Sequence, residues 1–174
     1  ISLLKIKNKS ISKIDNTIKF LLETHDNKLI ESVSMVDNKR HTVCISSQIG
    51  CNVDCYFCAT GKMGIDRNLN AGEIIEQLIL VKNNTSTPIT NIVFMGMGEP
   101  FLNYRNVIES CKIFTNHKAF NLGTKRITIS TAGILPQIDL FIKEKHKYKL
   151  ALSLNAPNDS IRNRIMPINK KWNI

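Results

Sequence analysis

From residue 42 to residue 154, short runs rich in β-branched residues alternate with longer segments whose apolar residues recur at helical spacing. Strands are expected at residues 42–47, 91–95, 126–130 and 150–154. Helices are expected at residues 71–81, after an N-cap at Asn70 with Glu73 as its capping partner, and at 107–114 and 135–144. Strands that alternate with helices in this way favour parallel βαβ units. Four such units make about half of a (β/α)8 barrel, in which chemistry gathers at the carboxyl ends of the strands.

The first 40 residues follow a different pattern. Residues 16–22 and 29–36 indicate two strands around the polar turn at 25–27. We therefore expect residues 1–40 to form an N-terminal β extension or linker. Residues 41–174 are expected to form the first half of a partial TIM-type barrel, so that the predicted fold class is α/β.

The composition constrains the partners and the cellular compartment that suit this chain. The formal charge of +10 suits a nucleic acid or another anionic partner. Lys, Ile and Asn are abundant together, however, as an AT-rich genome would produce, so the charge alone carries little weight. No apolar run reaches the roughly 18 residues that a membrane span needs. Five cysteines are an odd number for a disulfide framework, and a reducing compartment is expected.

Three cysteines follow the first strand of the predicted barrel. Cys51, Cys55 and Cys58 have the spacing Cys-x3-Cys-x2-Cys, in the run GCNVDCYFCATGKMG. Three thiolates can hold a [4Fe–4S] cluster and leave one iron open, whereas full coordination takes four ligands. Structural zinc is the alternative, with a fourth ligand from His41, Cys44 or Cys111. A second pair of closely spaced cysteines is missing, which favours the cluster, and zinc stays open.

Further polar groups follow the later strands. The run GMGEP at residues 96–100 offers glycines that let a ligand approach the backbone, and a carboxylate that can accept hydrogen bonds from an ammonium group. Ser130 and Ser153 place hydroxyls near the ends of the next two strands. Because the carboxyl ends of parallel strands share one edge, these groups are expected to gather with the cysteine loop.

Four segments are similar, in this order, to successive blocks of the RlmN/Cfr family of radical S-adenosylmethionine (SAM) enzymes, which methylate adenine in RNA. They are TVCISSQIGCNVDCYFCATGKMG, NIVFMGMGEPFLNYRNV, RITISTAGI and LALSLNAPNDSIRNRIMPINKKWNI. The resemblance implies a [4Fe–4S] cluster on the three cysteines and SAM as the second cofactor. It implies SAM contacts at Gly98, Glu99, Ser130, Ser153, Leu154 and Asn155. The family usually has histidine at the position of Asn155, and asparagine cannot replace histidine in acid–base chemistry.

The resemblance also implies two catalytic residues. Glu31, in the block LIESV, matches the general base that removes a proton from adenine. Cys44 matches the cysteine that resolves a covalent protein–RNA intermediate by forming a disulfide. Without the resemblance, Glu31 would be the solvent-facing member of a strand and Cys44 a buried strand cysteine. The methyl-carrying partner cysteine of the family lies near its C-terminus. Because the chain begins at Ile1 without a methionine, stops inside a family motif at Ile174 and is shorter than the about 250 residues of a complete barrel, it is expected to lack segments at both ends.

The function that the resemblance implies is methylation of carbon 2 of an adenine in 23S rRNA, with tRNA as a further substrate, through a methyl-cysteine intermediate. Methylation of carbon 8 is one alternative, and a non-catalytic fragment that binds metal and RNA is another. The expectation also includes an electron donor such as flavodoxin, a monomeric state, no membrane association and a cytoplasmic location.

Overall fold

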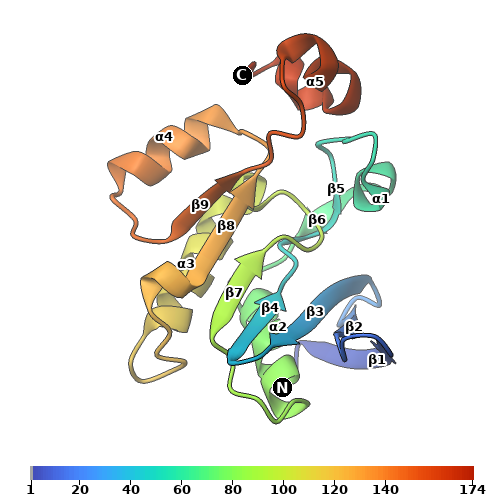
Figure 1. Ribbon diagram of the computed structural model, residues 1–174, viewed down its shortest axis with the longest axis vertical. Coiled ribbons are helices and arrows are strands. Elements are labelled where there is room, and N and C mark those ends of the chain that lie inside the picture. The colour runs from blue at the N-terminus through green and yellow to red at the C-terminus, as the bar shows by residue number, and fades with distance from the viewer. Residues whose placement is uncertain (1) are drawn as a thin grey trace.

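A computed structural model describes residues 2–174 (Figure 1). Seven strands form one sheet in the order β1-β2-β3-β4-β7-β8-β9. Its parallel half consists of β4 (Arg40–Cys44), β7 (Asn91–Phe94), β8 (Ile127–Thr131) and β9 (Lys149–Leu152). Helices α2 (Ala71–Asn83), α3 (Tyr104–Thr115) and α4 (Leu135–Lys143) connect these strands. The expected α/β fold with a partial barrel is confirmed.

The N-terminal extension belongs to the same sheet. Strands β1 (Leu4–Ile11), β2 (Ile18–Thr24) and β3 (Leu29–Asp37) pair antiparallel, and β3 pairs antiparallel with β4. Strand β1 was not predicted, whereas the turn at residues 25–27 is present and places Asn27 at a φ of 59°. The sheet therefore continues across residue 40, and the domain boundary there stays a prediction.

Helix α2 forms as its sequence predicts. Asn70 Oδ1 accepts a hydrogen bond of 2.9 Å from the backbone N–H of Glu73, and Glu73 Oε2 accepts one of 2.9 Å from the backbone N–H of Asn70. This capping box satisfies two of the N–H groups at the start of the helix. Ile74, Leu78 and Val81 are fully buried on the face that packs in the main hydrophobic core. The predicted apolar stripe is thus what attaches α2 to the sheet.

The cysteine loop lies in a hairpin that the sequence did not reveal. Strands β5 (Gln48–Cys51) and β6 (Gly64–Asn68) pair antiparallel in a separate two-stranded sheet, with the short helix α1 (Ala59–Lys62) between them. Gly50 has a φ of 76°, and a Cβ atom there would lie 1.9 Å from the carbonyl oxygen of Gly64. Only glycine allows this pairing. The predicted strand 42–47 is wrong at its end, because β4 stops at Cys44.

The C-terminal part differs from the expectation in two details. Strand β9 ends at Leu152, so residues 153–155 lie in the loop that follows it. Helix α5 (Asp159–Ile165) was not predicted, although Asn158 caps it by accepting a hydrogen bond of 3.0 Å from the N–H of Ile161. Short 3-10 helices η1 (Pro100–Asn103), η2 (Thr124–Arg126) and η3 (Pro167–Lys170) complete the structure. Within residues 2–174, none of the helices has both the length and the apolar character needed to cross a membrane.

Candidate cofactor site

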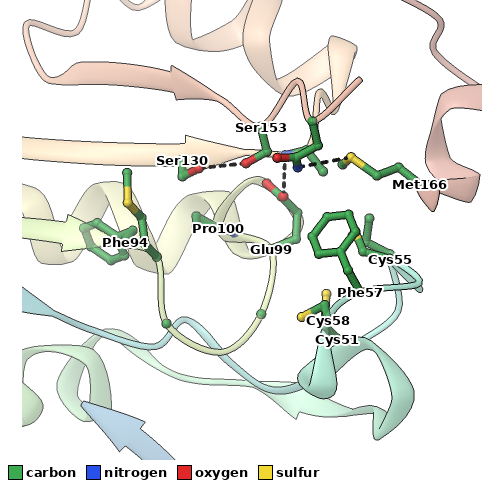
Figure 2. Close-up of a pocket in the computed structure, with 16 residues that line it drawn as sticks. Cys51, Cys55, Phe57, Cys58, Phe94, Glu99, Pro100, Ser130, Ser153 and Met166 are labelled. Carbon is green, nitrogen blue, oxygen red and sulfur yellow. Dashed lines mark hydrogen bonds between the residues drawn. The ribbon is translucent and has the colours of Figure 1, made fainter. Parts of the chain in front are cut away.

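A cavity of about 370 Å³ lies at the carboxyl ends of β7, β8 and β9 (Figure 2). Most of the predicted cofactor-binding residues line it: Cys51, Cys55, Cys58, Gly98, Glu99, Ser130, Ser153 and Asn155. Phe57 lines it as well, between the cysteines. Three predicted residues, Glu31, Cys44 and Leu154, do not line it. The topology therefore brings loops that are far apart in the sequence to one place, as parallel strands should.

The cysteine loop presents three thiols to this cavity. Cys51 is the last residue of β5, and Cys58 is the N-cap of α1. All five cysteines of the chain are free thiols. Figure 2 shows the three loop cysteines on the side of the cavity opposite Ser130 and Ser153. The two sides leave a space between sulfur ligands and hydroxyl groups.

Burial disfavours the charged form of two of these thiols, Cys51 and Cys55. The pKa of Cys55 is raised to about 11. Burial is the largest cause, and the negative charges of Cys58 and Cys51 add to it, whereas the guanidinium of Arg162 lowers the pKa. Burial likewise raises the pKa of Cys51. A cation bound to the sulfurs would offset both burial and mutual repulsion, since metals bind thiolates. Three sulfur donors, of which Cys51 is buried and Cys55 and Cys58 are half-buried, thus line one cavity and fit an iron–sulfur cluster.

The zinc alternative fits less well. Sulfur atoms around one zinc ion, with bonds of about 2.3 Å, lie roughly 4 Å apart. The three cysteines are not among the groups of residues 2–174 whose ligand atoms all lie within 4.8 Å of one another. None of the three suggested fourth ligands, His41, Cys44 and Cys111, lines the cavity. His41 Nε2 and Nδ1 are each 2.8 Å from a partner, Ser34 Oγ and the Thr87 carbonyl oxygen, and Cys111 is fully buried in α3.

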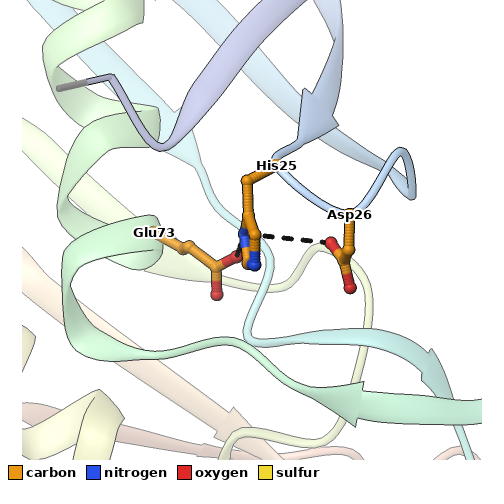
Figure 3. Close-up of side chains that lie close together, drawn as sticks. All are labelled: His25, Asp26 and Glu73. Carbon is orange, nitrogen blue, oxygen red and sulfur yellow. Dashed lines mark ion pairs between the residues drawn. The ribbon is translucent and has the colours of Figure 1, made fainter.

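The group that does meet this distance limit consists of His25, Asp26 and Glu73 (Figure 3). Its two carboxylates already share a cation. Arg67 donates hydrogen bonds of 2.8–2.9 Å to both oxygens of Asp26 and to both oxygens of Glu73. This ion pair joins the turn at residues 25–27 to the start of α2. We therefore interpret the group as a structural ion pair that ties the β extension to the barrel.

The glycine–glutamate loop rests directly on the hairpin. Gly98 has a φ of 94°, and a Cβ atom there would lie 2.5 Å from the Cβ atom of Gln48. Gln48 Oε1 accepts a hydrogen bond of 2.8 Å from the backbone N–H of Glu99. The close approach of Gly98 to Gln48 and this hydrogen bond together hold the loop after β7 against β5. The sequence predicted that a ligand approaches the backbone at this glycine, but it did not reveal that the side chain of Gln48 packs against it.

The carboxylate of Glu99 is largely occupied by the protein itself. Its Oε2 accepts a hydrogen bond of 2.7 Å from the N–H of Ala132, and its Oε1 accepts one of 3.0 Å from the N–H of Phe101. Burial raises the pKa of Glu99, while these hydrogen bonds lower it. Glu99 thus joins the loops that follow β7 and β8. The Thr131 hydroxyl also hydrogen-bonds to this carboxylate, which has about four acceptor positions in all, so one position is left for a ligand in the cavity.

The other predicted contacts come from the loops after β8 and β9. Ser130 Oγ and Ser153 Oγ are 3.1 Å apart. Asn155 has a φ of 55°, a left-handed conformation that asparagine tolerates, and its Nδ2 donates to Met166 Sδ at 3.4 Å. The Leu154 side chain is exposed instead of lining the cavity. Met166 was not predicted, and it closes one side of the site next to Asn155.

The two predicted catalytic residues lie on the open face of the sheet. Ser32 points toward α2, because its Oγ donates to Gln77 Oε1, so the neighbouring Glu31 points to the opposite face. Cys44 pairs with Val33, two residues after Glu31, and therefore shares that face. The Glu31 side chain is 42% exposed, and Lys19 Nζ lies 2.9 Å from its Oε1. Their catalytic roles stay predictions.

Comparison with known proteins agrees with this geometry. The sequence profile of the radical SAM superfamily matches residues 45–173. The probable dual-specificity RNA methyltransferase RlmN of Thermotoga maritima is 48% identical over 174 residues, which are 100% of this chain and 51% of that protein. The dual-specificity RNA methyltransferase RlmN of Buchnera aphidicola is 50% identical over 165 residues, which are 92% of this chain and 45% of that protein.

A solved structure leads to the same family. The crystal structure of a radical SAM methyltransferase from Sphaerobacter thermophilus matches with a TM-score of 0.94 and 42% identity, over 100% of this chain and 52% of that one. The chain thus spans about half the length of these relatives. The match of fold, motifs and cavity means that the chain belongs to the radical SAM superfamily, whose members use a [4Fe–4S] cluster and SAM.

Proposed function

We propose that this chain is the cluster- and SAM-binding part of a methyltransferase that modifies carbon 2 of an adenine in 23S rRNA and in tRNA. The observation that carries the proposal is the gathering of three cysteines, the Gly98–Glu99 loop and two strand-end hydroxyls around one cavity. The names of the similar proteins support RNA methylation with dual specificity. The carbon atom and the two kinds of RNA rest on the resemblance of the sequence motifs.

The residues of the cavity suit the two cofactors. Cys51, Cys55 and Cys58 would hold the cluster. Bound together, cluster and SAM supply a carbon radical, which suits a ring carbon that is a poor nucleophile. Ser130 and Ser153 offer hydroxyls that can donate to and accept from the ribose or the carboxylate of SAM.

Asn155 is the position where this chain differs from the family pattern. Its amide lies at the edge of the cavity and can still form hydrogen bonds with SAM. An amide does not exchange a proton near neutral pH, so the proposal gives Asn155 a binding role alone. Proton removal from adenine must therefore come from another group.

We assign that step to Glu31 and the release of the product to Cys44. Both lie on the face of the sheet that the helices leave open. A carboxylate on this face can accept the proton of the adenine carbon. Cys44 is a free thiol close to the end of β4, and burial raises its pKa. In the predicted mechanism Cys44 attacks the sulfur of the family's methyl-carrying cysteine: the S–S bond forms as the bond from that sulfur to the adenine-bound carbon breaks, and this carbon takes up a proton and leaves as the methyl group of the RNA. The proposal keeps the electron donor, the monomeric state and the cytoplasmic location as expected above.

Mass spectrometry of RNA tests the activity. The full-length protein, expressed in a bacterial strain without its own enzyme of this kind, should restore 2-methyladenosine in 23S rRNA and tRNA. The Cys58→Ser variant should restore none. If 8-methyladenosine appears in place of 2-methyladenosine, the enzyme methylates carbon 8, and the carbon-8 alternative is correct. Absence of both modifications from cells that contain soluble protein would refute it.

A second experiment tests the base. Glu31→Gln should stall the reaction and accumulate the covalent protein–RNA adduct on denaturing gels. Glu23→Gln is the matched control, because Glu23 is also a strand glutamate paired with a lysine, Lys7, at 2.9 Å. Normal turnover by Glu31→Gln would show that the base is another residue.

A further inference from the structure

Helix α5 carries a buried arginine that the proposed chemistry does not use. Arg162 is 3% exposed. Its Nη2 donates hydrogen bonds to the carbonyl oxygens of Ala132 at 2.6 Å and Ser153 at 3.2 Å, and its Nε donates to that of Leu154 at 3.0 Å. Its Nη1 donates to Asn169 Oδ1 at 2.6 Å. Every one of these acceptors is neutral.

The positive charge of Arg162 has no direct counter-charge. Within residues 2–174, no carboxylate oxygen lies within 4.0 Å of its guanidinium. The nearest link to a carboxylate runs through Asn169, whose Nδ2 donates to Asp159 Oδ1 at 2.8 Å. A buried charge without a partner is costly, and this cost points to an anion in the complete site.

The position of Arg162 indicates which anion this is. Two of its carbonyl partners, Ala132 and Ser153, belong to residues that line the cofactor cavity. The end of α5 also supports the cysteine loop, because the carbonyl oxygen of Ile165 accepts a hydrogen bond of 2.8 Å from the N–H of Tyr56. Met166, the next residue, packs in one small cluster with Cys51 and Ala132. Arg162 therefore lies directly behind the wall that faces the three thiols.

We propose that Arg162 is the positioning residue whose buried charge offsets the negative charge of the thiolate-bound cluster, while its guanidinium holds the ends of β8 and β9 together. A cluster held by thiolates gains a further negative charge on one-electron reduction, and a nearby cation favours that step. The inference rests on the cluster of the proposed function. It adds a residue that controls how readily the cluster accepts an electron.

The test is the reduction potential of the anaerobically reconstituted full-length protein, measured by EPR-monitored titration. Arg162→Gln should disfavour reduction at least tenfold, a shift of about 59 mV to more negative potential for one electron. Arg164→Gln is the matched control, because Arg164 is exposed two positions further along the same helix, and its potential should equal that of the wild type. Arg162→Lys should keep the potential but lose iron faster, since an ammonium group cannot replace the planar guanidinium on three carbonyls.

Two results would overturn the inference: a wild-type potential in Arg162→Gln, or an equal shift in Arg164→Gln. A tenfold loss of reducibility in the charged variant Arg162→Lys would overturn the inference as well. If Arg162→Gln does not fold, Asn169→Asp decides, because it keeps an acceptor for Arg162 Nη1 and places a counter-charge against the guanidinium; an unchanged potential in that variant would overturn the inference. A merely structural role would weaken iron retention in both Arg162 variants and leave the potential of each unchanged. Wild-type protein that binds no cluster would instead refute the proposed function, so the two failures are distinguishable.

Discussion

The replacement of Gln77 by methionine tests how helix α2 supports the site. Gln77 is fully buried. Its Oε1 accepts hydrogen bonds of 2.8 Å from the N–H of Ser46 and from Ser32 Oγ, and its Nε2 donates one of 3.0 Å to the carbonyl oxygen of Ser46. The side-chain amide thus replaces a strand partner just where β4 has ended. Ser46 Oγ in turn accepts a hydrogen bond of 2.9 Å from the N–H of Met97, next to Gly98.

The cost of this change can be worked from these contacts. Methionine has nearly the volume of glutamine but no strong donor or acceptor, so the N–H and C=O of Ser46 would stay buried without partners. Each unsatisfied group costs about 1–3 kcal/mol, so the two groups together give about 2–6 kcal/mol for the variant. At about 2–4 °C per kcal/mol for a chain of this size, Tm should fall by about 4–24 °C.

Thermal and urea unfolding followed by circular dichroism would measure this loss. Gln137→Met is the matched control, because Gln137 is a partly exposed glutamine in α4, and its stability should change by less than about 0.5 kcal/mol. A Gln77→Met variant as stable as the control would refute the reasoning that the amide of Gln77 replaces a strand partner.

Three further predictions follow from the described contacts. Gly98→Ala should weaken SAM binding at least tenfold in equilibrium dialysis, because the new Cβ atom would overlap Gln48; an unchanged affinity would contradict the close approach. In the Asp26→Asn variant, the free energy of unfolding should fall less steeply as the pH is lowered into the acid range. Arg67 holds the pKa of Asp26 well below its usual range, so this ion pair stabilises the fold at neutral pH and is lost as the pH falls below about 4; an unchanged acid slope in urea titrations would contradict it. Cys111→Ala should keep the iron content of the wild type while Cys58→Ser loses it, and loss of iron in both would show that Cys111 is a ligand.

The parallel half of the fold could be predicted because its signals are local. The apolar run at residues 92–94, with the β-branched pair Ile92 and Val93, and the capping pair Asn70 and Glu73 each specify an element by themselves. Parallel topology then places the residues after each strand at one edge, which is why Gly98 and Ser130 line the same cavity. Leu154 does not line the cavity, because β9 ends at Leu152 and the loop that follows leaves this side chain exposed; its contact with SAM stays a prediction.

The remaining features depend on contacts between distant residues. The β5–β6 hairpin consists of short strands whose pairing requires Gly50 to lie against the backbone of Gly64, and strand propensity does not encode this contact. From the sequence, Arg162 is expected to be a surface residue, since arginine is mostly exposed in proteins. Its burial depends on the carbonyl oxygen of Ala132, 30 positions away, which only the folded chain brings near.

Iron analysis together with EPR spectroscopy, on anaerobically reconstituted full-length protein with and without SAM, tests the central claim most directly. The claim is that Cys51, Cys55 and Cys58 hold a cluster with one open iron. We expect about four irons per chain and a reduced EPR signal that changes when SAM is added. Bound zinc in place of iron, or a cluster signal that SAM leaves unchanged, would contradict the account.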